Sequence, residues 1–232
     1  MRRIVFLTAA AAGCAGVSLA GGGGQMPGGV GQMPGGRPSM NQPAPDNSSP
    51  PPAVKPDLAA KKAYLAGMKS LDKGKDYEAA AQRAANPDRR AGSLERAADA
   101  YNRALDQFTE ALSNNADMVE AWNAVGYVHL RLGAYGESVD DYNHALNLKP
   151  DLEEAILHRA EAFVGVDRLD EAKSAYMDLF SHQRSFADEL MTAMQKWLAD
   201  HRLDARGMSA GAISSFEQWL QEREAIAKQA PA

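Results

Sequence analysis

Apolar and small residues recur at an interval of 34 positions in the second half of the chain. Trp122 is followed by Ile156 at that interval, and Tyr142 is followed by Tyr176. The same register extends backwards, because Phe108 precedes Tyr142 by 34 positions. This period is typical of helix–turn–helix repeats, in which each unit buries its apolar face only against its neighbours. The pattern therefore predicts an all-α solenoid with a binding surface rather than a catalytic pocket.

Upstream of these repeats, the pattern predicts a degenerate helical repeat region over residues 57–113. Alanine, leucine and charged residues dominate it, and no segment alternates with the period of a strand. A first helix carries an apolar stripe made of Leu58, Tyr64, Leu65, Met68 and Leu71. We expect a turn at 73–76 and a second helix over 77–85. Pro87 ends that helix, because proline cannot continue the hydrogen-bond ladder, and a third helix runs from about Ser93 to Ser113.

Residues 117–184 contain clearer signals for helix starts and turns, and they predict two repeat units. Each N-cap candidate is followed three residues later by a glutamate, as in a capping box: Asp117 with Glu120, and Asp151 with Glu154. Gly133 falls at the turn inside the first unit, where a left-handed backbone costs glycine least. Small residues should let helices approach closely while aromatic rings fill the space between them. These residues are Gly126, Ala145, Ala160, Tyr142 and Tyr176.

Residues 185–232 predict two further amphipathic helices. The first helix should start near Ser185 and end by about Asp200. Its apolar stripe consists of Phe186, Leu190, Met194, Trp197 and Leu198. A second helix from about Ser209 carries Ile213, Phe216, Trp219 and Leu220. Because a solenoid needs its last open face covered, we interpret these helices as a C-terminal cap. The alternative is an exposed apolar stripe used for self-association.

Residues 1–20 resemble a signal peptide for export. Arg2 and Arg3 form a basic start, an apolar stretch follows, and Ala20 ends a small-residue cleavage site. The apolar stretch is too short for a spanning helix. Cys14 is a candidate lipidation site, because the residues before it resemble a lipobox, which leaves soluble export and lipid anchoring both open. Cys14 is also the only cysteine, so no intramolecular disulfide can form.

Residues 21–56 are rich in glycine and proline and predict a disordered, flexible linker. The sequence Gly-Gln-Met-Pro-Gly-Gly occurs there twice, at 24–29 and 31–36. Glycine and proline oppose regular structure, so the simplest interpretation is a flexible tether between the N-terminal segment and the folded region. A copper site at the repeated methionines is a weak alternative, because two thioethers without histidine or cysteine nearby bind metal poorly.

The overall charge argues against nucleic acid as a partner. The chain has a net charge of −5, and removing Arg2 and Arg3 leaves 23 basic against 30 acidic residues, or −7. An acidic surface repels phosphate backbones and anionic lipids. We therefore expect no nucleic-acid binding, and membrane association only through a lipid anchor at Cys14.

The 34-residue units resemble tetratricopeptide repeats. In that family the first helix carries aromatic, apolar and small residues, the second carries small and aromatic residues, and a proline closes the unit. The matching slots here are Trp122, Val125, Gly126, His129, Ser138, Tyr142, Ala145 and Pro150. The next unit fits less well, with Ile156, Arg159, Ala160, Phe163, Ala172, Tyr176 and Leu179. Upstream, Ala104, Phe108 and Ala111 match a second helix whose first helix is not found at the usual distance, which suggests a degenerate unit at 64–84 followed by an insertion.

The resemblance implies that inward residues of first helices line a partner-binding groove. The corresponding residues are Glu120, Asn123, Tyr127, Leu130, Arg131, Glu154, Leu157, Glu161 and Val164. A family subgroup grips C-terminal carboxylates with cations here, but Glu154 and Glu161 occupy places that would need positive charge. We therefore expect a protein or peptide partner with basic residues. The alternative is that these residues are only solvated helix faces.

Candidate chemistry elsewhere is weak. Glu154, His158 and Glu161 share a helical face, but no second histidine stands near, so surface charge pairing is the better interpretation than a metal site. His129 occupies a slot that is normally buried, which favours a satisfied core histidine. The glycine-rich segment neither follows a strand nor opens a helix, so no phosphate loop is indicated, and no nucleophile elbow is present. The sequence thus predicts a protein without enzymatic activity and without a cofactor.

The resulting hypothesis is an exported adaptor or scaffold in the envelope of a Gram-negative bacterium, located in the periplasm and either soluble or anchored through Cys14. It would bind a partner through a repeat groove. The alternative is a self-associating structural component whose terminal helices make the contact.

Overall fold

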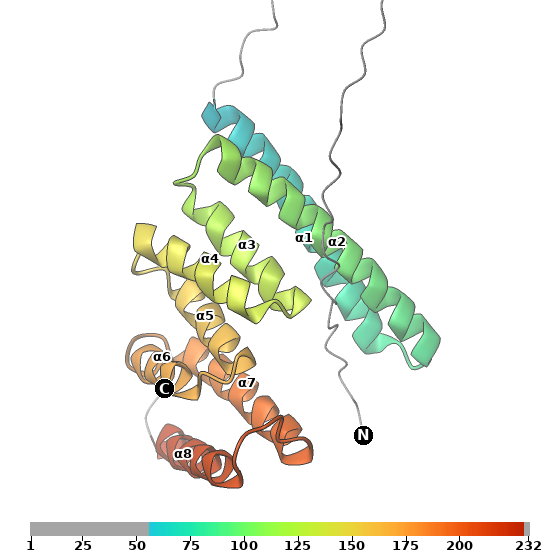
Figure 1. Cartoon of the computed structure of the whole chain (residues 1–232). Helices are drawn as coiled ribbons and strands as arrows, with labels where there is room; N and C mark the ends of the chain where they lie inside the picture. The colour runs from blue at the N-terminus through green and yellow to red at the C-terminus, as the bar shows by residue number, and fades with distance from the viewer. Residues whose placement is uncertain (1–55, 230–232) are drawn as a thin grey trace, which may run out of the picture. The chain divides into compact units, whose positions relative to one another are not determined.

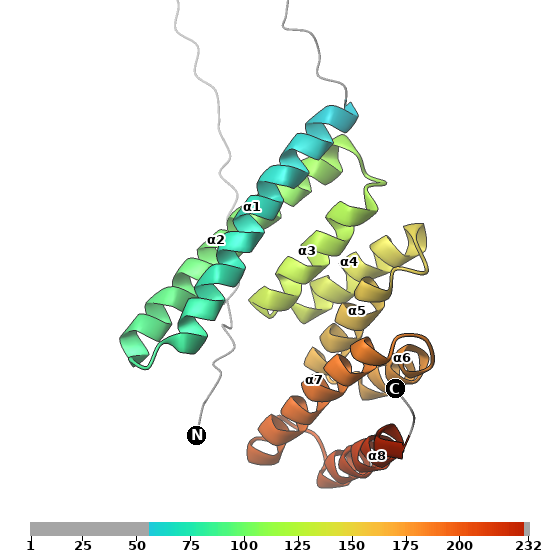
Figure 2. The same ribbon diagram turned by 180° about the vertical axis from the view of Figure 1, so that it is seen from behind.

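The computed structural model describes residues Pro56–Gln229 and places eight α-helices in this range, with no strand among the described residues. Figures 1 and 2 show them from opposite sides. Their bounds are α1 (Pro56–Arg83), α2 (Pro87–Asn114), α3 (Val119–Leu132), α4 (Tyr135–Leu148), α5 (Glu153–Gly165), α6 (Leu169–His182), α7 (Arg184–Leu203) and α8 (Ala210–Gln229). The predicted signal peptide and linker, with Cys14 and the repeated methionines, lie outside the described residues.

The helices pack as consecutive pairs, and each pair contacts the next. The pairs are α1 with α2, α3 with α4, α5 with α6, and α7 with α8, and the first helices α3, α5 and α7 also contact one another in sequence order (Figure 1). This arrangement confirms the predicted all-α helical repeat fold. The repeat therefore aligns its first helices side by side.

The predicted small-residue contacts hold the central pair together. A Cβ atom placed on Gly126 would lie 3.0 Å from the ring of Tyr142, so glycine lets α3 approach α4 without displacing that ring. The Oγ of Ser138 donates a hydrogen bond to the Gly126 carbonyl oxygen over 2.8 Å, and all three residues are buried. Ala160 and Tyr176 are buried at the equivalent places of α5 and α6. Because the site is filled by a rigid ring, a larger side chain at position 126 has no space.

The predicted turn at 73–76 is wrong, because α1 continues through it as one helix of 28 residues. Two glycines inside α1 explain the continuity: a Cβ on Gly67 would clash with the ring of Phe108, and a Cβ on Gly74 with the ring of Tyr101. Glycine is thus present in this helix for close packing against α2. The turn chemistry suggested by Lys-Gly-Lys-Asp is overridden by tertiary packing.

This long hairpin also supplies the first helix that the sequence did not locate. Phe108 packs on Gly67, so α1 is the partner of the second-helix pattern in α2. The expected degenerate unit at 64–84, followed by an insertion, is wrong because α1 is one continuous helix. Both helices have 28 residues, twice the 14 of α3 and of α4. The extra length lies between Gly67 and Phe108, which explains why no first helix appears at the usual spacing.

Helix α2 begins six residues earlier than predicted, at Pro87 rather than Ser93. The Oδ1 of Asn86 accepts hydrogen bonds from the backbone N–H groups of Asp88 and Arg89, at 2.8 and 3.1 Å. Asparagine at the N-cap followed by proline at the first helical position is a strong start signal. Pro87 therefore opens this helix, whereas α1 has already ended at Arg83.

The predicted capping boxes and the predicted start at Ser185 are also wrong. Helices α3 and α5 have Met118 and Leu152 at their N-caps, without a side-chain cap hydrogen bond, so Asp117 and Asp151 lie one residue too early to cap them. Helix α7 begins at Arg184, and the side chain of its N-cap residue, Gln183, makes no capping hydrogen bond. These helix starts are determined by packing and by the backbone turns before them. Gly133, by contrast, has the predicted left-handed backbone, with φ of 79°.

The apolar stripes of the last two helices are turned inward. Leu190, Met194, Trp197 and Leu198 of α7 are buried, as are Phe216 and Leu220 of α8, and they share a core cluster with α5 and α6. The rings of Trp197 and Phe216 meet edge to face with centroids 5.2 Å apart. The stripes are therefore packed against the repeats, as expected for a cap.

Candidate functional site

We define the inner face as the surface formed by the first helices α1, α3, α5 and α7. It includes the polar or aromatic side chains of Lys75, Glu78, Glu120, Tyr127, Arg131, Glu154, His158 and Glu161, all of which are at least partly exposed. Helix α5 contacts α3 directly, and the Arg131–Glu78 ion pair joins α3 to α1, so these side chains belong to one continuous surface. The inner face is the surface on which the sequence placed the partner-binding groove.

Two of the predicted groove residues are not on this surface. Leu157 is only 1% exposed and Val164 is 5% exposed, because both pack in the core that α5 shares with α6 and α7. Asn123, Tyr127, Leu130 and Glu161 are partly exposed, while the remaining predicted residues are exposed: Glu120, Arg131 and Glu154. Leu157 and Val164 therefore support the solenoid and cannot touch a partner without unfolding.

An ion pair ties α1 to α3 across the inner face. The Nη2 of Arg131 lies 2.6 Å from Oε2 of Glu78, and the Lys75 ammonium lies 4.7 Å from the centroid of the Tyr127 ring. Burial lowers the pKa of the Arg131 guanidinium, but the Glu78 carboxylate more than offsets this and holds that pKa above its usual range. The contacts fix two prominent side chains of the face, Arg131 and Tyr127, in defined positions.

A second group of contacts joins α3 to α5. The ring of Tyr127 meets that of His158 edge to face, with centroids 5.3 Å apart. The Nδ1 of His158 lies 2.9 Å from Oε2 of Glu161, and its Nε2 lies 4.0 Å from Oε1 of Glu154. This is the charge pairing that the sequence favoured over a metal site. Across Pro56–Gln229, no group of three or more His, Cys, Asp or Glu side chains is placed to hold a metal ion.

At its N-terminal end, the inner face opens into a cleft of about 410 Å³ between α1 and the start of α3. Its polar lining consists of Asp57, Lys61, Tyr64, Asn115, Asp117 and Glu120, and its apolar lining of Ala60, Leu65 and Met118. Burial and the charges of Glu120 and Glu154 raise the pKa of the Tyr64 hydroxyl. We call this feature the N-terminal cleft.

At the other end of the inner face, α7 lies near the start of α4. Burial lowers the pKa of the Lys196 ammonium, and the nearby Asp200 carboxylate opposes that shift. Burial also raises the pKa of the Tyr135 hydroxyl to about 12. A Cβ on Gly165 would clash with the Tyr135 ring, so α4 and α5 are in close contact here.

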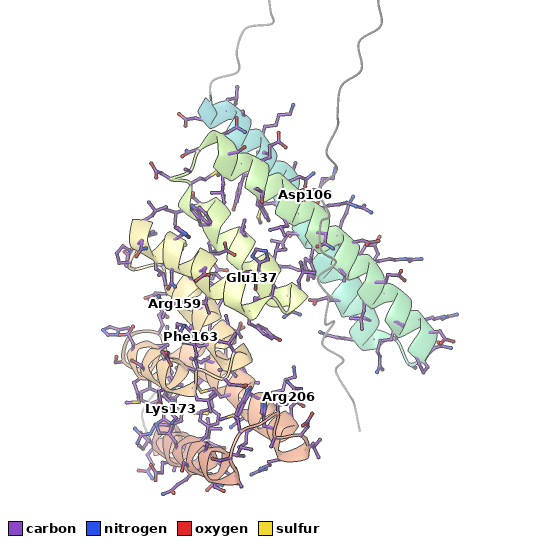
Figure 3. All side chains as sticks on the ribbon, viewed as in Figure 1. Asp106, Glu137, Arg159, Phe163, Lys173 and Arg206 are labelled. Carbon is purple, nitrogen blue, oxygen red and sulfur yellow. The ribbon has the colours of Figure 1, made fainter. Side chains whose placement is uncertain are left out.

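Other conspicuous side chains join helices to one another. His129 of α3 places Nδ1 at 2.6 Å from Oδ2 of the buried Asp141 of α4, in agreement with the expected satisfied histidine. Arg159 donates to Oδ1 of Asn143 over 2.9 Å and lies 5.6 Å from the Phe163 ring (Figure 3). Burial and the charge of Arg168 lower the pKa of the Arg159 guanidinium. These contacts are structural.

Sequence reasoning missed every inner-face residue of α1, because it placed a turn inside that helix. Tyr64 was assigned only to an apolar stripe, and Lys75 and Glu78 fell in or just after the supposed turn. The signal that could have found them is the second-helix pattern around Phe108, which requires a first helix to pack against. Tyr101 and Phe108 of α2 are seven residues apart, and so are the two glycines of α1 that their rings contact. Gly74 lies against Tyr101, and Gly67 lies against Phe108.

None of the helices between Pro56 and Gln229 combines the length and the apolar character needed to cross a membrane.

Comparison with known proteins gives one family match. Residues 119–152 match the model of the tetratricopeptide repeat, a span that covers α3, α4 and the turn after them. Among solved structures, the tetratricopeptide repeat domain of Arabidopsis OM64 is similar, with 17% sequence identity and a TM-score of 0.41, over 58% of this chain and 98% of that one. No curated protein matches the chain significantly.

The tetratricopeptide repeat is a protein–protein interaction module and generally a non-catalytic scaffold.

Proposed function

Because this chain is a tetratricopeptide repeat protein, we propose that it is a non-enzymatic adaptor that binds a protein partner on its inner face. The observation that supports this most directly is the character of that face. Helices α3 and α5 present Glu120, Tyr127, Glu154 and Glu161 to solvent, although the core beneath them is closed by Leu157. Aromatic side chains surrounded by polar groups are typical of protein interfaces.

The contacts within the inner face favour binding. Tyr127 is held between Lys75 and His158, and Arg131 is held by Glu78, before any partner arrives. Side chains that are ordered in the free protein lose little conformational entropy when they enter an interface. The inner face is therefore preorganised to recognise a surface of fixed shape.

We further propose that the protein acts in the periplasm of a Gram-negative bacterium, soluble or anchored through Cys14. The proposal rests on the basic start at Arg2 and Arg3, the apolar stretch after it and the small residues before the cut at Ala20. The mass of the mature protein recovered from cells tests it. A chain that starts at Gly21 indicates soluble export, a lipid-modified chain that starts at Cys14 indicates anchoring, and a chain that retains Arg2 contradicts both.

Self-association through the last two helices is the weaker alternative. Its basis was an exposed apolar stripe, but Trp197, Phe216 and Leu220 are buried against the repeats. The same residues suit the capping role that an adaptor requires.

Capture of partners from an envelope extract tests the adaptor proposal. The informative variant is Glu154→Lys/Glu161→Lys, which reverses two charges on the inner face of α5 and spares the buried Leu157. The matched control is Asp106→Lys/Asp140→Lys, which reverses two exposed charges on the second helices α2 and α4; Asp106 is labelled in Figure 3. Captured proteins are compared by mass spectrometry.

We expect the wild type and the control to capture the same protein, and the α5 variant to lose it while keeping its helical circular dichroism. Equal capture by all three proteins would contradict binding on the inner face. Capture of only the chain itself would favour the self-associating alternative.

A further inference from the structure

The N-terminal cleft is more acidic than the rest of the inner face, where Glu154 and Glu161 also carry negative charge. In the middle of the face, Arg131 and Glu78 neutralise each other. The cleft is instead lined by three carboxylates, from Asp57, Asp117 and Glu120, against a single cation, Lys61. Neither Asp117, Glu120 nor Lys61 has an ion-pair partner within 4.0 Å among the described residues. With three carboxylates and one ammonium, the described lining of the cleft carries a net charge of −2.

These carboxylates are distributed along the cleft walls. They come from the start of α1, from the loop before α3 and from the first turn of α3. No three acidic side chains in the part of the chain that the structure describes are close enough together to hold a metal ion. A distributed set of carboxylates suits an extended cation, such as a lysine or arginine side chain, better than a small ion.

The cleft also offers apolar surface to such a side chain. Leu65 and Met118 line it, and Leu65 is 57% exposed. Leu58, two turns earlier on α1, is 63% exposed, so two large apolar side chains stand at solvent on the same helix. Lysine and arginine bury the methylene groups of their side chains on apolar surface while the charged end remains hydrated or paired. Exposed leucines beside a cleft are typical of a docking surface.

We propose that the N-terminal cleft binds a lysine or arginine side chain of the partner, with an apolar neighbour of that residue resting on Leu58 and Leu65. The inference rests on the proposed function, because it specifies which segment of a partner the inner face would select. Charge complementarity decides the occupant: three carboxylates and two exposed leucines fit a basic and apolar segment and repel an acidic one.

Fluorescence anisotropy with defined peptides tests this. The probe is a short labelled peptide that alternates lysine with leucine, titrated with the full chain at low and at physiological salt. Matched peptides carry glutamate in place of lysine, or serine in place of leucine. The cleft variant is Asp117→Asn/Glu120→Gln, and the control variant is Glu95→Gln/Asp106→Asn, which removes the same charge from an exposed part of α2. Circular dichroism verifies that both variants are folded.

We expect the lysine–leucine peptide to bind the wild type and the control variant with affinities within about twofold of each other. The cleft variant should bind about tenfold more weakly, since hydrogen bonds to charged groups are lost. The glutamate peptide should not bind, the serine peptide should bind more weakly, and salt should weaken binding to the wild type more than to the cleft variant.

Absence of binding to the wild type, or equal binding by the cleft variant, would overturn the inference. Displacement of the peptide by calcium ions would assign the cleft to a metal, and concentration-dependent self-association that the cleft variant abolishes would assign it to a second copy of the chain; either would also overturn it. The adaptor proposal would survive these outcomes if the Glu154→Lys/Glu161→Lys variant still failed to capture a partner that the wild type captures.

Discussion

Gly133 and Asp167 lie 34 residues apart and occupy the same left-handed turn position of successive units, with φ of 79° and 61°. Glycine adopts this conformation without strain, whereas aspartate is one of the few other residues that tolerate it. The aspartate has a second role. Its Oδ1 accepts a hydrogen bond from the Trp197 indole N–H over 2.9 Å and lies 3.3 Å from Nε2 of the buried His201. The turn between α5 and α6 is thereby joined to α7.

Substitutions at Asp167 should separate the two roles. Asp167→Ala loses the bond to Trp197 and keeps a left-handed backbone that alanine disfavours, so we expect a loss of about 2 kcal/mol in the free energy of unfolding. Asparagine in Asp167→Asn still offers an oxygen that can accept the Trp197 hydrogen bond, and it also tolerates the left-handed backbone. This variant should therefore lose less than about 1 kcal/mol in the free energy of unfolding. Urea denaturation measures both. If the alanine variant were as stable as the asparagine variant, neither the turn strain nor the bond to Trp197 would matter.

Two glycines in the long hairpin should respond oppositely to alanine. Gly74→Ala places a methyl group against the Tyr101 ring and should destabilise the protein by about 1–3 kcal/mol. Gly92→Ala in α2 meets no atom within 4 Å, and should stabilise by about 0.5–1 kcal/mol through helix propensity. Thermal unfolding of the two variants compares them directly. Stabilisation by Gly74→Ala would mean that α1 and α2 are not in close contact at this position.

The ion pair between Arg131 and Glu78 should couple α1 to α3. We expect a double-mutant cycle with Arg131→Met and Glu78→Gln to give a coupling free energy of about 1 kcal/mol, lower at high salt. A cycle between Arg131→Met and the distant, exposed Glu95→Gln serves as the control and should give about zero. A coupling near zero in the first cycle would show that the pair does not help to dock the hairpin.

Buried tyrosines should make the protein sensitive to alkali. Burial raises the pKa of the hydroxyls of Tyr127, Tyr135 and Tyr142, that of Tyr135 to about 12, while an unfolded tyrosine titrates near about 10. The folded state thus holds these protons more tightly than the unfolded state. Its stability is retained below pH of about 10 and should fall between about 10 and 12. Absorbance of tyrosinate should rise together with the loss of helical circular dichroism, and Tyr135→Phe should reduce the pH dependence.

The sequence predicted the central repeat from its internal period. Tyr142, Tyr176 and Gly133 are repeat positions whose partners lie within one unit, so local spacing was sufficient to place them. Gly74 was misread as a turn residue because its packing partner, Tyr101, lies on another helix and beyond any local window. The role of Asp117 was misassigned because helix starts shift by a residue or two when packing outweighs capping. Leu157 was assigned to the groove because the family resemblance marks the inward positions of a first helix without showing that Leu157 packs in the core with α6 and α7.

The central claim is that the inner face touches a protein partner, and site-specific photo-cross-linking tests it most directly. Benzoylphenylalanine replaces Tyr127, an aromatic residue on the inner face, and in a second protein replaces Asp140, an exposed residue on α4. Both proteins are produced in the native cell and irradiated. We expect a cross-link from position 127 to another protein and none from position 140. Cross-links from position 140 with none from 127 would contradict it.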